Sequence, residues 1–265
     1  MSNAATSPWP TALSLTPIDL SALIPPSAAG ERDSGKQPTL STHLLDLALD
    51  QLSTFPDPAA GWKRLADRPG ANGGEGAKVE SYRSADGWAG RRSEHRPDEL
   101  SWEHVVVRRT IAPLSTRLEL TLPVALLRQD HVYHRHYETE SEFVPTLKAF
   151  SALAPSPLPL GPLPSRLAPT TSSSSSSVEH QAGLFKLHYA MPTPLQPRTF
   201  VVGLLQTLDQ SRRELWTVTV PVDHPDVPRS SGKESGRVRA AYASIERIRQ
   251  IEGDRLEWSY VLRPR

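Results

Sequence analysis

The sequence predicts an α+β domain built on one antiparallel sheet. One amphipathic segment near the N-terminus has helical periodicity. Several later segments alternate between apolar and polar residues or are rich in β-branched residues, and the C-terminal third is almost entirely of this kind. A chain with few helices and many consecutive strands is typical of the α+β class.

The first element is a helix predicted over 40–54. Thr39 or Ser41 can cap its start, and Pro56 and Pro58 end it. Its apolar residues fall at helical spacing, as Leu40, Leu44, Leu45, Leu47, Ala48, Leu49 and Leu52.

A glycine-rich break, GANGGEG, separates this helix from three predicted strands at 77–84, 87–94 and 102–111. Residues 123–150 favour a second helix, which is interrupted or ended near Pro145.

The C-terminal part is predicted to be a meander of strands. Apolar or alternating segments begin at Phe185, Phe200, Leu215 and Leu256. The sequence PVDHPDVPRSSGKESG forms a long hairpin loop between two of them. The segment 237–249 fits a helix or a strand from its own pattern.

Proline is concentrated in two places, and the chain has 26 of them. Residues 1–38 are expected to be a mostly disordered lead-in, although PIDLSALIPP (17–26) has enough apolar residues to dock. Residues 151–178 combine dense proline with a run of serines, so we expect a flexible insertion there. The folded domain is therefore predicted over 39–262, interrupted by this insertion.

Composition excludes several classes of site. The net charge is +1, so the chain lacks the excess of basic residues that is typical of nucleic-acid-binding proteins. The absence of cysteine excludes disulfides, zinc sites with thiolate ligands and cysteine nucleophiles. No signal peptide and no 18-residue apolar window are found, so we expect a cytoplasmic protein without a membrane span.

The sequence HVYHRHYETESEF (131–143) raises the question of a metal site. Zinc on a helix requires histidines at i and i+4, whereas these are spaced by three and two. His131, His134, Glu138 and Glu142 would share one helix face and could form a weak site. A solvated, partly ion-paired face is favoured over a metal site.

Motifs of catalysis are absent. There is no G-x-S-x-G sequence, and Ser93 and His95 have no context for a triad. SGKESG lacks the residues of a P-loop, and GGEG follows no apolar strand. The residues therefore give no argument for an enzyme, a cofactor or a metal.

Charged residues inside or beside the apolar strands offer a different kind of site. Arg198, Glu246, Arg247 and Glu257 are placed in this way. Buried charges must be paired and can line a ligand cavity. An exposed sheet face or strand edge explains the same pattern and is favoured by the pattern alone.

Five motifs in order resemble a fungal family of uncharacterised START-like domains, which is related to the steroidogenic acute regulatory lipid-transfer proteins. They are WAGRRSEH (88–95), HYETESEFVPTLK (136–148), MPTPLQPRTFVVGLL (191–205), VRAAYASIERI (238–248) and LEWSY (256–260).

The resemblance implies a START-like helix-grip fold, in which a curved antiparallel sheet holds a long C-terminal helix over an apolar cavity. It implies that 237–249 is a strand and that the histidine-rich segment belongs to a structural helix. The implied ligand-binding candidates are Arg198, Tyr242, Ser244, Glu246 and Trp258. The implied structural positions are Trp88, Arg91, Ser93, His95, His136, Phe200, Arg247 and Glu257.

The chain departs from the family in two respects. Residues 98–122 are longer than the family spacing, and the chain stops at VLRPR, where relatives continue into the C-terminal helix. We therefore expect an exposed apolar patch on the sheet. A truncated gene model or splice form, closure by 17–26, or a partner that supplies the lid would each explain it.

Three functions are compatible with these observations. The first is non-enzymatic binding of a lipid, sterol or other apolar molecule, with Arg198 and Glu246 orienting its head. The second is an interaction protein whose Pro- and Ser-rich segments, such as 155–164, bind a protein partner. The third and weakest is a cyclase or hydrolase that uses His188 or Glu246 as a base.

Overall fold

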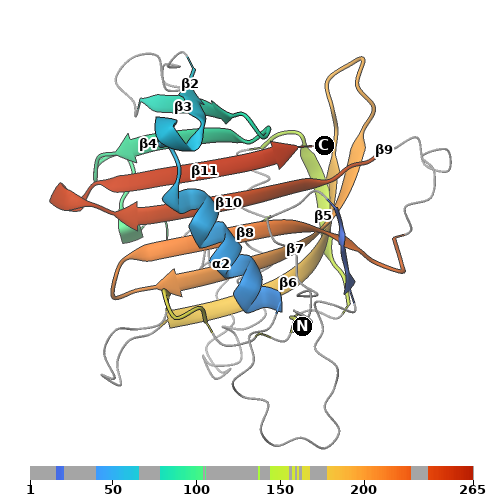
Figure 1. Ribbon diagram of the computed structural model, residues 1–265. Helices are drawn as coiled ribbons and strands as arrows, with labels where there is room; N and C mark the ends of the chain where they lie inside the picture. The colour runs from blue at the N-terminus through green and yellow to red at the C-terminus, as the bar shows by residue number, and fades with distance from the viewer. Residues whose placement is uncertain are drawn as a thin grey trace, which may run out of the picture.

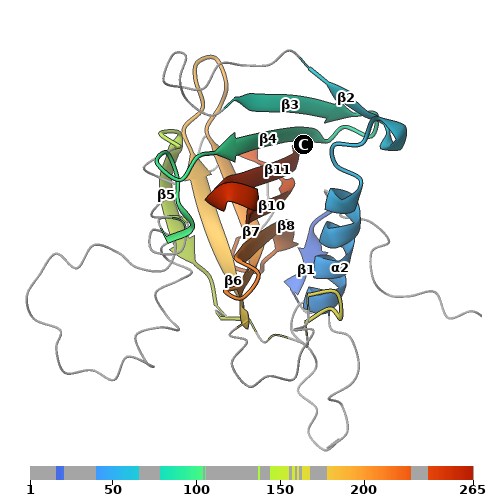
Figure 2. The ribbon, with the colours of Figure 1, turned by 90° about the vertical axis from the view of Figure 1, so that its left-hand side faces the viewer.

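An antiparallel sheet in the order β2-β3-β4-β11-β10-β8-β7-β6-β5 organises the molecule. The computed structural model describes residues 16–20, 40–65, 78–103, 105, 137, 144–154, 157–158, 160, 163–167, 178–227 and 238–264. Figures 1 and 2 show that the sheet is twisted and curved, with helix α2 against one face. Its main strands are β2 (Trp62–Arg64), β3 (Val79–Ser84), β4 (Ala89–His95), β5 (Leu147–Ala152), β6 (Val178–Tyr189), β7 (Arg198–Asp209), β8 (Glu214–Asp223), β10 (Tyr242–Gln250) and β11 (Leu256–Pro264).

Residues far apart in the sequence pair at the centre of the sheet. Strand β4 pairs with β11, so that Val261 lies opposite Gly90. The long strands β6, β7 and β8 are joined as consecutive hairpins, which matches the predicted meander. Residues 242–250 are a strand, as the family resemblance implied.

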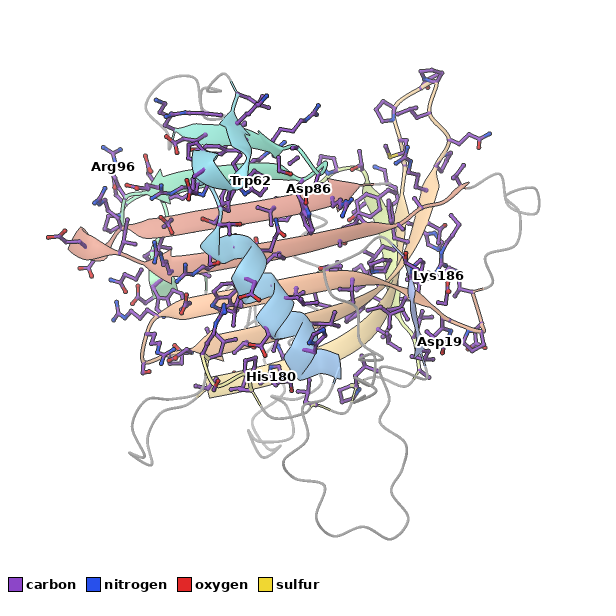
Figure 3. The ribbon with its side chains drawn as sticks, viewed as in Figure 1. Asp19, Trp62, Asp86, Arg96, His180 and Lys186 are labelled. Carbon is purple, nitrogen blue, oxygen red and sulfur yellow. The ribbon has the colours of Figure 1, made fainter. Side chains whose placement is uncertain are left out.

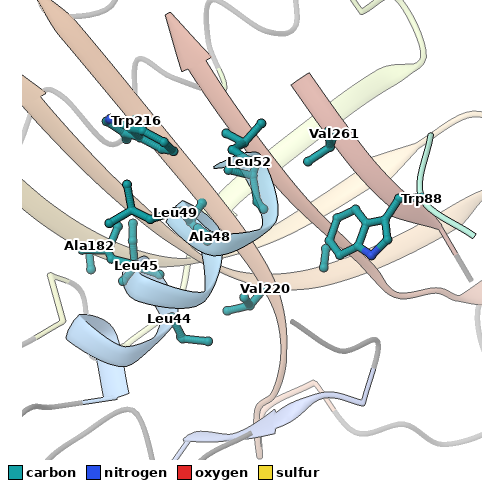
Figure 4. Close-up of a cluster of buried hydrophobic side chains, with 14 of the residues drawn as sticks. Leu44, Leu45, Ala48, Leu49, Leu52, Trp88, Ala182, Trp216, Val220 and Val261 are labelled. Atoms are coloured by element: carbon teal, nitrogen blue, oxygen red, sulfur yellow. The ribbon is translucent and has the colours of Figure 1, made fainter. Parts of the chain in front are cut away.

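Helix α2 (Leu40–Ser53) confirms the predicted helix and covers one face of the sheet. Leu44, Leu45 and Ala48 are fully buried against the strands (Figure 4). We call the apolar residues between helix and sheet the α2 cluster. It includes Trp88 from the β3–β4 connection and, from the strands, Leu184, Leu205, Trp216, Val218, Ile245 and Val261. The predicted α+β class, with a curved antiparallel sheet packed against a helix, is confirmed.

The segment after α2 also packs on this face. Phe55 makes edge-to-face contacts with Trp62 and Tyr82, at centroid distances of 4.8 and 5.2 Å. Gly90 lies directly beneath the Phe55 ring, where a β-carbon would clash. A glycine is therefore required on β4 at this point of close approach.

The lead-in contributes a short strand. β1 (Ile18–Asp19) pairs in parallel with β8, with Ile18 opposite Val222. Ile18 and Leu20 pack against the α2 cluster. The described part of the apolar segment 17–26 therefore docks on the domain, as its apolar residues had indicated, and the rest of 1–38 lies outside the described residues.

The predicted flexible insertion at 151–178 is also wrong where the structure describes it. Strand β5 continues to Ala152, and Leu158 and Leu167 are 5% and 6% exposed within the α2 cluster. The backbone N–H of Leu158 donates to the carbonyl of Ala182 at 2.9 Å. Leucines spaced between the prolines bury apolar surface, and an estimate from proline and serine content overlooks them.

The structure describes two other predicted elements only in part. Trp102, Glu103 and Val105 are helical, so the strand predicted over 102–111 is wrong for these residues. Trp102 and Val105 are both buried, which a single helical turn achieves as well as a strand does. The segment 123–150, predicted as a helix interrupted or ended near Pro145, is helical at Tyr137, and the helix has ended before β5 begins at Leu147. The rest of this segment up to Phe143 lies outside the described residues.

The predicted exposed patch is not found on the described sheet. Strand β11 ends at Pro264, and no helix follows it within the described residues. The large apolar side chains that are exposed among those residues are Leu65, Leu195 and Val238, which lie outside the sheet's centre. No helix in the described part of the chain is long and apolar enough to cross a membrane.

Candidate functional site

Side chains along each strand alternate between the two faces of the sheet, and this alternation divides the candidate residues between the two faces. On β10, Ala243 and Ile245 belong to the α2 cluster, whereas Tyr242 and Ile248 belong to clusters on the other side. We call that other side the opposite face.

Two apolar clusters lie on the opposite face. The first, the Phe185 cluster, contains Tyr137, Leu147, Phe185, Leu187, Phe200, Val202 and Leu204, with Tyr189 and Tyr242 at its border. The second, the Trp102 cluster, contains Trp102, Val105, Leu208, Leu215, Ile248 and Leu256, with Trp258 at its border.

A polar band separates these two clusters on the same face. It consists of Gln181, Gln206, Thr217, Thr219, Ser244 and Glu246. Gln206, Thr217 and Glu246 are 4%, 3% and 8% exposed. Four members form a row of directly opposed residues across β6, β7, β8 and β10, in the order Gln181, Gln206, Thr217 and Glu246. Thr219 and Ser244 lie opposite each other beside this row.

Hydrogen bonds run along the band. Gln181 donates from Nε2 to Oε1 of Gln206 at 3.2 Å, and Gln206 donates from Nε2 to Oγ1 of Thr217 at 3.2 Å. Glu246 is the next residue in the row, opposite Thr217. Burying a polar group costs free energy unless the group is hydrogen-bonded. These hydrogen bonds therefore allow a row of polar side chains to lie between two apolar clusters.

The structure places the five predicted ligand-binding residues on the opposite face but not in one group. Ser244 and Glu246 lie in the polar band. Tyr242 packs edge-to-face on Phe200 at 5.1 Å, in the Phe185 cluster, and Trp258 borders the Trp102 cluster. Arg198 is half-buried at the start of β7, opposite Tyr189.

Three family-motif residues have structural roles, Trp88 and Arg247 on the α2 side and Phe200 on the opposite face. Trp88 is 1% exposed within the α2 cluster. Arg247 donates to Glu214 at 2.5 Å and lies over the Trp216 ring at 5.0 Å. Phe200 is a core residue of the opposite face.

Glu257 is held by two arginines on the α2 side. Its carboxylate accepts from Arg92 at 2.6 Å and from Arg249 at 2.7 Å, and its side chain is 6% exposed. Burial alone would raise the pKa of Glu257, but the hydrogen bonds and charges of Arg249 and Arg92 outweigh it, so this pKa is lowered. Glu257 and Arg247 are therefore paired and do not line the polar band.

The motif residues of β4 lie at the border of the opposite face. Arg91 is exposed at the end of the row that contains Glu246 and Tyr260. Ser93 and His95 are joined by a hydrogen bond of 2.9 Å between Oγ and Nε2. Burial lowers the pKa of His95, which the charge of Glu99 opposes.

The remaining motif residue, His136, and most of the histidine-rich segment lie outside the described residues. Among the described residues, no group of acidic or histidine side chains could hold a metal ion.

The candidate bases of the enzymatic hypothesis are on different sides of the sheet. His188 lies on the α2 side, hydrogen-bonded to Thr199 at 2.9 Å, whereas Glu246 is in the polar band. The arrangement offers hydrogen bonding and apolar contact on the opposite face but does not bring these two groups together.

Sequence reasoning missed Gln181, Gln206, Thr217 and Thr219. The signal was present in LWTVTV, where Thr217 and Thr219 alternate with apolar residues, and in LLQTL, where Gln206 interrupts an apolar run. Such a residue lies on one face of its strand, but only the register across strands shows that the polar residues meet.

The model of the family described as "Protein of unknown function (DUF3074)" matches residues 88–263. No curated protein matches the chain.

Three solved structures are similar to the chain at low identity. The human StarD13 (DLC2) lipid transfer and protein localization domain is 13% identical, with a TM-score of 0.42 over 84% of this chain and 82% of that chain. Human STARD10 is 11% identical, with a TM-score of 0.45 over 88% and 70%. A STAR-related lipid transfer protein fragment from Xanthomonas axonopodis is 15% identical, with a TM-score of 0.39 over 77% and 81%.

Proposed function

The chain belongs to the family described as Protein of unknown function (DUF3074), and we propose that it binds a lipid, a sterol or another apolar molecule without changing it chemically. The binding surface is the opposite face of the sheet, and the polar band orients the ligand.

The observation that carries this proposal is the buried polar band between two apolar clusters. A ligand with an apolar body and one polar group matches this pattern. Its apolar surface would be removed from water at either side of the band, which contributes about 25 cal/mol per Å². The band would supply the few placed hydrogen bonds that fix orientation in ligand sites.

Arg198 is our candidate for contacting the ligand at the Phe185 cluster end. It lies on the same face as the band and next to the aromatic pair of Tyr189 and Phe200, whose centroids are 5.3 Å apart. Arginine over or beside aromatic rings at a partly buried site suits a polar or charged head group.

Mass spectrometry of co-purified lipids tests the proposal. The chain of residues 1–265 is expressed, purified and extracted with organic solvent, and the extract is compared with that of an unrelated protein from the same host. We expect a lipid near one equivalent per chain. An empty protein that also fails to take up sterols or long-chain lipids from vesicles would contradict the proposal.

Arg198→Ala tests the assignment of this residue when lipid uptake from vesicles is measured. We expect weaker binding, by about 10-fold for the loss of one charge-assisted hydrogen bond, with an unchanged unfolding midpoint. The matched control is Lys186→Ala, which removes a cation from the α2 side of the same hairpin (Figure 3). Equal affinity in wild type and Arg198→Ala would remove Arg198 from the site.

The other two functions have less support. An interaction protein that acts through its Pro-rich segment needs that segment free, whereas Leu158 and Leu167 are buried in the α2 cluster. An enzyme needs two groups near one reacting atom, whereas His188 and Glu246 lie on different sides of the sheet.

A further inference from the structure

Arg198 lies at one end of the opposite face, at the start of β7. We infer that the ligand carries an anionic group, such as a carboxylate, sulfate or phosphate, and that Arg198 binds this group at the Phe185 cluster end of the face. This inference rests on the proposed function and concerns the same face.

The first argument is that Arg198 has no partner. Its side chain is half-buried, and no hydrogen bond or ion pair joins it to another described residue. The half-buried arginines of β10 differ from it, because Arg247 is paired with Glu214 and Arg249 with Glu257. A cation that is partly removed from water without a counter-ion is unfavourable, and an anionic ligand would supply that counter-ion.

The second argument is the sign of the charge around Arg198. The described members of the Phe185 cluster and its border include no acidic residue. Glu246, a buried acidic residue of the same face, lies in the row that crosses β7 at Gln206. Gln206 is eight residues from Arg198, a distance of roughly 26 Å along an extended strand. Asp223, at the end of β8, has a partner other than Arg198. This end of the face therefore has a positive charge that no described side chain pairs with.

The third argument is the apolar surface that begins beside Arg198. Tyr189 lies opposite Arg198 on β6, and Phe200 follows two positions along β7 on the same face. The ring of Phe200 makes edge-to-face contacts with Tyr189 at 5.3 Å and with Tyr242 at 5.1 Å. A ligand whose anionic group is bound by Arg198 therefore has its apolar body next to ring surface, where burial of that body is favourable.

The exposed fraction of the side chains rises along the face toward Arg198. Phe185 and Leu187 are fully buried, Phe200 is 9% exposed, and Arg198 is half-buried. Beside Arg198, Val238 of β9 (Val238–Arg239) is 40% exposed. Arg198 thus lies at the rim of the face, where a charged group stays partly hydrated and its desolvation costs less than in the interior.

Matched ligand pairs test the inference with the full chain. We would measure the Kd of oleyl sulfate and oleyl alcohol, and of cholesteryl sulfate and cholesterol, by equilibrium dialysis of the radiolabelled compounds at neutral pH. Each pair shares its apolar body and differs in the polar group alone. We expect the sulfate to bind about 10-fold more tightly than the alcohol in each pair that binds, because it forms charge-assisted hydrogen bonds with Arg198.

Arg198→Gln tests the residue that discriminates. The amide keeps hydrogen-bond donors but loses the charge, so the ratio of the two Kd values should approach one while the Kd of the alcohol stays the same. Arg198→Lys keeps the charge and should retain part of the preference. Circular dichroism checks the folding of each variant, and Arg198→Ala takes the place of Arg198→Gln if the latter does not fold.

Arg91→Gln is the matched control. Arg91 is exposed on the same face but lies in the row that contains Tyr260 and Glu246, away from the Phe185 cluster. Its substitution should leave the preference for the sulfate unchanged. Flotation with phosphatidylcholine vesicles, with and without phosphatidylglycerol, separates a bound ligand from the head groups of a bilayer. We expect Arg198→Gln to leave the association with both kinds of vesicle unchanged.

The outcomes separate the two proposals. Equal or tighter binding of the alcohols by the wild type would overturn the inference of an anionic group and leave ligand binding intact. A preference for the sulfate that Arg198→Gln keeps, or that Arg91→Gln removes, would also overturn it, as would an effect of Arg198→Gln on vesicle association alone. Binding of none of the four compounds, together with an empty purified protein, would overturn the proposed function itself.

Discussion

Two buried glutamates, one on each face of the sheet, have different surroundings. Glu246 lies in a band of amides and hydroxyls, whereas Glu257 is clamped between Arg92 and Arg249. A buried carboxylate with two arginine partners is stabilised in its ionised form, and this makes the stability of the protein depend on pH.

Glu257→Gln should destabilise the protein most at neutral pH. We expect a loss of about 1.5–3 kcal/mol of unfolding free energy at pH 7, because hydrogen bonds to a charged group are lost. The value should be near the lower bound, since Arg92 and Arg249 are 32% and 38% exposed and water screens them. Urea unfolding followed by tryptophan fluorescence measures it.

Glu257→Gln should also make the unfolding free energy depend less on pH in the acidic range. The pKa of Glu257 is lowered in the folded state, so its ionised form contributes stability above the ordinary glutamate pKa of 4.5. That contribution is lost as the pH falls through the lowered value. The difference in unfolding free energy between wild type and variant should decrease from pH 5 toward pH 3. A gap that is constant with pH would contradict the assignment, and Glu94→Gln serves as the exposed control.

At the scale of elements, the Pro-rich segment fastens helix α2 to the sheet. Leu153 donates from its backbone N–H to Leu184, and Leu158 donates to Ala182, so the segment follows the edge of β6. Arg166 pairs with Asp50 of α2 at 2.6 Å. The leucines described in this segment all pack in or against the α2 cluster, as Leu153, Leu158, Leu160, Leu163 and Leu167.

Leu158→Ala should therefore behave as a core substitution. We expect a loss of about 2–5 kcal/mol, because a buried leucine leaves a cavity between the segment, α2 and β6. The matched control is Leu195→Ala in the β6–β7 turn, where the side chain is 50% exposed and the effect should be within about 0.5 kcal/mol. Thermal unfolding of both variants measures the difference, and equal effects would show that the segment does not contribute to the core.

At the scale of the whole molecule, one apolar cluster joins elements from nearly the whole chain. The α2 cluster includes Leu44 from the helix, Leu158 from the Pro-rich segment and Val261 from the last strand. The opposite face is formed by the other side of the same strands. Neither α2 nor the Pro-rich segment has a core of its own.

We therefore expect a single unfolding transition for the intact chain. Far-UV circular dichroism reports the strands and the helix, and tryptophan fluorescence reports both faces of the sheet, through Trp88 and Trp216 in the α2 cluster and Trp102 in the Trp102 cluster; the two signals should give the same midpoint. Midpoints that differ between the two signals would contradict this expectation.

The sequence by itself determined the elements whose signals are local. The leucine spacing of 40–54 gives α2, and the apolar runs at Phe200 and Leu215 give β7 and β8, because helical and strand periodicities are written in neighbouring residues. The alternation of β10 also places Tyr242, Ser244 and Glu246 on one face once that segment is a strand. Trp102 and the Pro-rich segment were mispredicted because short apolar segments do not fix their conformation without partners.

Only the tertiary structure decided which face is which and what the polar residues form. The register of four strands brings Gln181, Gln206, Thr217 and Glu246 into one row, and no local pattern specifies a pairing between strands far apart in the chain. The docking of α2 on one side then leaves that row on the other, between two apolar clusters. Packing of distant residues forms this row, and so the proposed ligand site depends on contacts that the linear sequence does not contain.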